Sequence, residues 1–164
     1  MDEPAPILPG KKDLFAYLRM GLVTGLVSKD EAVAWADQAL LESPVPDYDF
    51  VQLSLASRLS LAQMVELVSR MQGEARYGLP LGMLFARAGR LLTKGPHQSV
   101  EIIQGIRLLR AEVYLPPTIR QSLLGLEIDL DTYRQNRMEL DELSSRLAEF
   151  LEPYAGYLSL VERG

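Results

Sequence analysis

Few residues in this chain of 164 amino acids have the types and spacing to do chemistry. The single histidine, His97, lies two residues before Ser99 and could act as a general base beside it. Side chains two residues apart do not share a helical face, so we interpret the pair as the start of a helix. The chain has no cysteine, which excludes a thiol nucleophile, a zinc ribbon and an iron–sulfur cluster. One histidine likewise excludes a multi-histidine metal site.

Two pairs of carboxylates could also do chemistry. Glu127 with Asp131, and Glu139 with Glu142, each lie on one face of an expected helix, where they could bind a metal or serve as acid and base. Such pairs are common on solvated helices, and no phosphate-binding loop or nucleophile motif accompanies them. We therefore predict a non-enzymatic protein with no catalytic residue, no metal site and no cofactor.

Acidic residues beside an aromatic residue favour contact with a protein partner. Residues 47–49, Asp-Tyr-Asp, follow the rigid segment 44–46, Pro-Val-Pro. An aromatic side chain supplies contact area, and acids complement a basic target. The alternative for residues 47–49 is a helix N-cap whose neighbours pack inward. The predicted partner-binding residues are Asp47, Tyr48, Asp49, Glu139, Asp141 and Glu142.

The net charge of −5 conceals three blocks of opposite sign. Residues 1–57 carry 4 basic and 9 acidic residues, residues 58–120 carry 9 and 4, and residues 121–164 carry 4 and 9. Basic middle helices packed beside acidic outer ones would neutralise each other; otherwise the blocks form faces of opposite sign that steer partners. We do not expect nucleic acid as a partner, because the isoelectric point is near 5 and no recognition motif is present.

The elements that must position these residues are all predicted to be helices. Apolar residues recur at helical spacing, no alternating strand pattern appears, and 48% of the residues are apolar, enough for a self-sufficient core. We predict an irregular all-α bundle of six to eight helices, with residues 1–10 as an irregular arm and residues 11–164 as a single helical domain. Ser28 and Ser60 each open a helix with a capping box, since a Glu or Gln follows three residues later.

Glycine positions add two expectations about the helices. Gly25 is expected to end the first helix and Gly73 a later one, because glycine tolerates the left-handed conformation of a C-cap. Gly82 and Gly89 lie seven residues apart, almost on one face of the helix that starts near Pro80. We expect another helix to approach that face closely, which would offset the cost of about 1 kcal/mol that each glycine imposes on a helix.

The most regular pattern in the sequence spans residues 118–152. From Ile119 to Tyr154, mostly apolar residues recur at alternating steps of four and three, and the phase persists across residues 133–137. We predict one long C-terminal helix of about 35 residues, about 50 Å at 1.5 Å per residue. The rival is two helices hinged near Asn136. A helix with this stripe could also form the seam of a homodimer.

Residues 25–37, Gly-Leu-Val-Ser-Lys-Asp-Glu-Ala-Val-Ala-Trp-Ala-Asp, resemble small helical bacterial proteins of unassigned function, some of them immunity proteins encoded beside toxin genes. The resemblance covers 13 of 164 residues and carries no binding residue across. It implies a bacterial protein whose partner is another protein, with a toxin as one example.

Together these patterns predict a protein-interaction module, with toxin neutralisation as one form, in which an acidic and aromatic surface occludes a basic partner site. The alternatives are a homo-oligomeric structural module and a small-molecule-binding regulator with a pocket near Gly82 and Gly89. Residues 1–6 lack a secretory signal pattern, and the apolar run at 79–86 is far short of the roughly 20 residues that span a bilayer. We therefore expect a cytoplasmic protein without membrane contact.

Overall fold

The computed structural model of the protein describes residues 9–73 and 78–161. The structure is 77% helical, and no strand occurs among the residues described. The predicted all-α class is therefore confirmed. Most of the predicted N-terminal arm, residues 1–8, lies outside the described residues.

Short connections join the helices. α7 is a single four-residue turn that follows α6 after two residues, and α9, η1 and α10 run on as one helical segment of 22 residues. With α6 and α7 counted together, the described part of the chain forms eight helical stretches. The elements are α1 (Lys11–Thr24), α2 (Lys29–Glu42), α3 (Tyr48–Ser54), α4 (Leu61–Gln72), α5 (Gly78–Leu92), α6 (Gln98–Ile106), α7 (Leu109–Glu112), α8 (Pro117–Arg134), α9 (Leu140–Leu151), the 3-10 helix η1 (Glu152–Tyr157) and α10 (Leu158–Val161).

Local cap chemistry places the helix ends as the sequence predicts. Ser28 and Ser60 both form complete capping boxes at the starts of α2 and α4. Gly25 ends α1 with a left-handed φ of 77°, and its N–H donates to the carbonyl oxygen of Leu22. Asp47 caps α3 through its side chain, as the N-cap alternative required.

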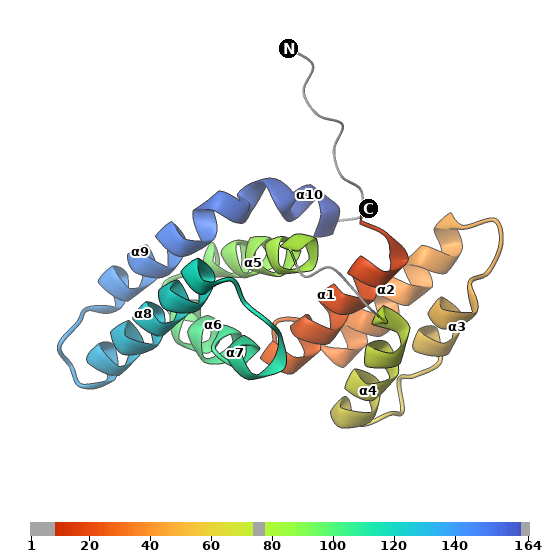
Figure 1. The fold of residues 1–164 in the computed structure, drawn as a ribbon, viewed down its shortest axis with the longest axis horizontal. Coiled ribbons are helices and arrows are strands. Elements are labelled where there is room, and N and C mark those ends of the chain that lie inside the picture. Colours follow the sequence, from red (N-terminus) through yellow and green to blue (C-terminus); the bar gives the residue numbers. More distant parts are fainter. Residues whose placement is uncertain (1–8, 74–77, 162–164) are drawn as a thin grey trace, which may run out of the picture.

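Two helices, α1 and α5, occupy the centre of the molecule (Figure 1). Residues 14–18 of α1 and residues 80–86 of α5 are buried without interruption. α1 packs against α4, α5, α6 and α7, whereas α5 also packs against α9, η1 and α10. A helix that is covered on most sides needs apolar residues around most of its circumference, which explains why neither of these runs contains a charged residue.

One charged side chain reaches into this interior from α5. The Nε–H of Arg87 donates to the carbonyl oxygen of Leu26 at 2.6 Å, and the guanidinium forms an ion pair with Glu31. The other carboxylate oxygen of Glu31 accepts the N–H of Ser28 in the α2 capping box. The guanidinium also lies beside the phenol of Tyr17, whose pKa it lowers in part. Arg87 therefore ties α5 to α1, to the α1–α2 connection and to the first turn of α2.

The ion pairs favour mutual neutralisation of the three charge blocks. Within the part of the chain that the structure describes, two ion pairs join a basic residue of the middle block to an acid of an outer block, and a third joins two blocks in the opposite sense. These pairs are Arg87–Glu31, Arg19–Glu112 at 3.0 Å and Arg110–Glu127 at 2.7 Å. Each pair also joins two different helices, so the charge layout helps to determine which helices lie side by side.

The predicted single helix over residues 118–152 is wrong, and the rival with a hinge near Asn136 is confirmed. α8 ends at Arg134, and Asn136 adopts a left-handed φ of 59°. The N–H of Arg137 donates to the carbonyl oxygen of Thr132, and the N–H of Asn136 to that of Tyr133, at 3.0 Å each. This is a Schellman motif with asparagine in place of glycine. The predicted long C-terminal helix exists only as the 22-residue segment from α9 to α10.

Close helix approach at the glycines of α5 is confirmed. A Cβ on Gly82 would lie 3.0 Å from the ring of Tyr157, and one on Gly89 would lie 3.8 Å from Cβ of Leu151. The same constraint acts at Gly105 of α6, where a Cβ would overlap the carbonyl oxygen of Thr24 in α1. These contacts bring the C-terminal segment onto α5, and α6 onto the end of α1.

We predict that Tyr17 makes the free energy of unfolding fall in alkaline solution. Burial raises the pKa of Tyr17 from 10.0 to about 12, although the nearby Arg87 lowers it in part. The unfolded chain releases this proton near pH 10, whereas the folded chain retains it. The contribution of Tyr17 is therefore complete below about pH 10 and is lost as the pH rises to about 12. A pKa shift of about two units corresponds to roughly 3 kcal/mol of unfolding free energy.

Urea unfolding on both sides of pH 10 measures this contribution. The wild-type protein should lose more unfolding free energy across that interval than Tyr17→Phe, which has no proton to release. Tyr114→Phe is the matched control, because Tyr114 is 75% exposed. Equal losses in the wild type and Tyr17→Phe would contradict the prediction.

Candidate functional site

The two acidic groups predicted to bind a partner lie at opposite ends of the molecule. α3 follows Asp47 and lies at one end of the longest axis, whereas the connection between α8 and α9, which contains Glu139, lies at the other (Figure 1). The structure therefore does not bring the six predicted residues onto one surface, and each group must be judged separately.

Asp47 and Asp49 are engaged within the chain. The carboxylate of Asp47 accepts the backbone N–H of Asp49 at 2.9 Å. Nζ of Lys11 lies 2.6 Å from the carboxylate of Asp49 and 3.3 Å from that of Asp47. The hydrogen bond to Asp49 is the largest of the effects that raise the pKa of Lys11. Both acids therefore hold the start of α3 against the start of α1.

Tyr48, between these two acids, points into solvent with three apolar neighbours on the same helical hairpin. Leu41, Val45, Tyr48 and Leu55 are each at least 71% exposed. Tyr48 and Leu55 lie seven residues apart on one face of α3, and Gln52 between them donates to the Tyr48 hydroxyl at 2.8 Å. We name residues 29–55, which contain these side chains, the α2–α3 hairpin.

The sequence predicted only Tyr48 of these four exposed side chains. Leu41 was detectable, because it falls outside the buried stripe of α2, in which only Ala32 and Ala36 are fully buried. Leu55 was not, because its exposure depends on how α3 packs against the rest of the chain.

Aromatic stacking holds the α2–α3 hairpin on the core. Phe50 of α3 stacks on the buried Phe15 of α1 with ring centroids 5.2 Å apart, and Trp35 of α2 lies 6.1 Å from Phe50. Trp35 is half-buried and packs against the core. The aromatic contacts therefore hold the outer face of the hairpin in a fixed position relative to the core.

The second acidic group completes the start of α9. Glu139 is the N-cap residue, although its side chain makes no cap bond, while Asp141 and Glu142 lie in the first turn, where the helix dipole favours acids. Glu142 pairs with Arg146 at 3.0 Å, and Arg146 also contacts Asp129 of α8 at 3.0 Å. Local helix electrostatics account for this group without a partner.

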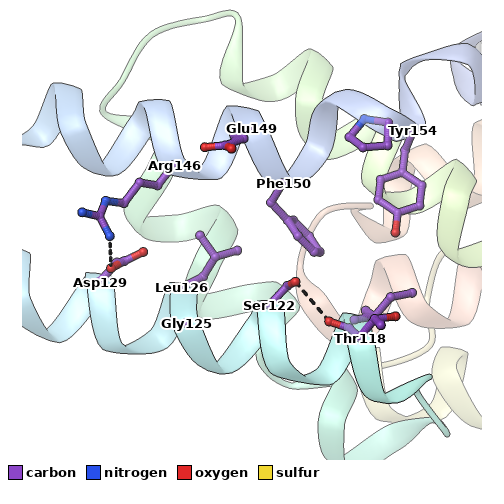
Figure 2. A pocket seen from close by; sticks show the side chains of 11 residues that line it. Thr118, Ser122, Gly125, Leu126, Asp129, Arg146, Glu149, Phe150 and Tyr154 are labelled. Carbon is purple, nitrogen blue, oxygen red and sulfur yellow. Dashed lines mark hydrogen bonds and ion pairs between the residues drawn. The ribbon is translucent and has the colours of Figure 1, made fainter.

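A groove of about 500 Å³ lies between α8 and α9 (Figure 2). Phe150 points from α9 towards α8 and forms part of the lining together with Leu126. The Arg146–Asp129 ion pair bridges the two helices farther along, and Ser122 donates to the carbonyl oxygen of Thr118. The lining combines apolar side chains with polar and charged ones, and the volume falls within the usual range of small-ligand sites.

Gly125 faces this groove without a packing reason for being glycine. It lies in the middle of α8 and lines the groove, yet a Cβ on it would meet nothing within 4 Å. A glycine in a helix interior costs about 1 kcal/mol relative to alanine. The missing side chain therefore keeps space open in the groove at the expense of helix stability.

A second groove, of about 490 Å³, lies between α5 and the segment from α9 to α10. Its lining is mostly apolar and includes Gly89, Leu92, Leu151 and Leu158. Gly89 therefore lines a groove, as predicted, whereas Gly82 is covered by Tyr157.

The other residues considered for chemistry contact different partners and do not form the catalytic or metal-binding pairs that were considered. The ring of His97 contacts the side chain of Gln98 at 3.2 Å, and Ser99 is fully buried with its hydroxyl unpartnered. Glu127 pairs with Arg110 rather than facing a metal site. Within residues 9–73 and 78–161, no group of three or more His, Asp or Glu side chains could hold a metal ion.

Known proteins do not add to these observations. No family model matches the chain, and no curated protein or solved structure matches it either. Among the described residues, no helix is both long enough and apolar enough to cross a membrane. The surface chemistry of the chain itself must therefore indicate the function.

Two glycine-to-alanine variants test whether Gly125 has no packing role and lowers the stability of α8. Gly125→Ala should raise the free energy of unfolding by about 1 kcal/mol, because the new methyl group enters open space and favours the helix. The matched variant Gly105→Ala should destabilise the fold strongly, since its methyl group would overlap the backbone of Thr24. Chemical denaturation measures both changes. A Gly125→Ala protein less stable than the wild type would contradict the account.

Proposed function

We propose that this protein is a non-enzymatic interaction module that binds a basic protein partner through its α2–α3 hairpin. The observation that carries the proposal is the exposure of Leu41, Val45, Tyr48 and Leu55 within 15 residues. Single exposed apolar side chains are ordinary, but a group of large ones within one helical hairpin is typical of a protein-binding surface.

The charge of the hairpin specifies the kind of partner. Residues 29–55 carry six acidic residues and one lysine, which gives a net charge of −5. Lys11 and Arg87 pair with three of these acids, while Asp30 and Asp37 have no ion pair with any described residue. An acidic rim around apolar anchors favours a partner with basic residues around an apolar pocket.

The hairpin is also suited to binding because it is held in place beforehand. The Phe15–Phe50 stack and the Lys11 ion pairs fix α3, so little ordering entropy is lost when a partner docks. A toxin with a basic active surface is one partner of this chemistry. The resemblance of residues 25–37 to immunity proteins is the reason for naming it.

A matched pair of tyrosine variants tests this proposal. Tyr48→Ser removes an exposed anchor from the hairpin, and Tyr114→Ser removes one of similar exposure, 75%, from the other half of the chain. The tagged protein should capture a basic protein from extracts of its source cells, with affinity that falls as salt rises. Tyr48→Ser should weaken that binding at least tenfold, as loss of an interface anchor does, and Tyr114→Ser should not change it.

Two outcomes would contradict the proposal. One is equal binding by the wild type and Tyr48→Ser. The other is a captured partner whose binding does not depend on salt, because acidic complementarity would then play no part.

A second candidate function, ligand binding in the α8–α9 groove, is favoured by Gly125. A thermal-shift screen of small molecules should find ligands that stabilise the wild type but not Gly125→Leu, whose side chain would fill the groove. Ligands that stabilise both proteins equally would place binding elsewhere.

A further inference from the structure

The outer face of α8 carries an exposed stripe that no other part of the described chain covers. Ile128 is 65% exposed and Leu124 is 39% exposed. Arg120 precedes Leu124 by four residues, Ile128 follows Leu124 by four, and Asp131 follows Ile128 by three, so all four lie on one helical face. Both charged residues are exposed, and neither has an ion pair with a described residue.

This stripe is distinct from the one predicted to form a dimer seam. Leu123, Leu126 and Leu130, which belong to the regular four-and-three pattern, are buried inside the chain. They pack in the interface that α8 makes with α6 and α9. The predicted seam is therefore occupied within the chain, and the opposite face of α8 remains.

The order of residues in the exposed stripe is self-complementary. The stripe has a cation at its start, two apolar side chains in the middle and an anion at its end. The midpoint between Arg120 and Asp131 lies within about half a residue of the midpoint between Leu124 and Ile128. This offset is less than about 1 Å along the helix axis. A single two-fold axis therefore pairs both sets of residues when two copies of α8 cross antiparallel.

We propose that α8 binds α8 of a second copy of this chain in an antiparallel, two-fold symmetric contact. Arg120 of each copy then meets Asp131 of the other, and Leu124 of each packs on Ile128 of the other. A parallel contact is disfavoured, because it would place Arg120 against Arg120 and Asp131 against Asp131. The proposal is independent of the α2–α3 hairpin, which lies at the end of the molecule away from the α8–α9 connection (Figure 1).

Charge reversal tests this pairing, and a mixture of two charge-reversed variants serves as the rescue experiment. Sedimentation velocity over a wide range of protein concentration should detect a dimer of the full chain. Arg120→Asp and Asp131→Arg should each weaken dimerisation by about tenfold or more, because each places like charges together at two symmetry-related positions. An equimolar mixture of the two variants should regain a dimer that contains one copy of each, since both contacts then join opposite charges.

The mixture also separates loss of pairing from loss of folding, because a misfolded variant could not be rescued by its counterpart. Ile128→Ser should abolish the dimer, whereas Leu55→Ser, on the α2–α3 hairpin, should leave it intact. The proposal is overturned by a wild type that stays monomeric at high concentration. It is also overturned by charge variants that dimerise like the wild type, or by a mixture that remains monomeric.

Discussion

The burial of α1 and α5 around most of their circumference is the constraint on which the remaining structure depends. Phe15 and Leu18 of α1 and Phe85 of α5 are all at most 1% exposed, and each such side chain contributes roughly 1.5–3 kcal/mol by leaving water. Most of the other helices pack on this pair, whereas α2 packs mainly on α3, and α8 packs on α6 and α9. Arg87 enters the same interior beside Tyr17, where the Leu26 carbonyl and Glu31 supply the partners that a half-buried guanidinium requires.

Each of the peripheral helices α2 and α8 buries only one face. α2 fully buries only Ala32 and Ala36, and α8 buries a single stripe of three leucines. The apolar residues on the outer faces of these elements, such as Leu41 and Ile128, therefore contribute little to the core. Both proposed contacts rest on these outer faces, which the fold itself does not use.

The sequence predicted those features that depend on a few neighbouring residues. Ser28, Ser60 and Gly25 fix helix ends through local hydrogen bonds, and all three were predicted correctly. The break at Asn136 was weighed and not favoured, because asparagine adopts the left-handed conformation less often than glycine and the apolar phase happens to continue across the turn. Regular four-and-three spacing of apolar residues is compatible with a single helix and also with two antiparallel helices.

The candidate site was harder to predict, because it depends on contacts between distant residues. Lys11 forms an ion pair with Asp47, which lies 36 residues away in the sequence, and no local sequence pattern indicates that contact. Tyr48 was identified from its acidic neighbours, whereas the exposure of Leu55 and the empty space beside Gly125 follow from tertiary packing alone.

Native-state hydrogen exchange tests the central role of α1 and α5 most directly. If these two helices carry the fold, their amides should exchange only through global unfolding, with opening free energies equal to that of the whole protein. The amides of α3, which covers the core from one side, should exchange through a smaller local opening. Amides of α1 and α5 that open as easily as those of α3 would contradict the account.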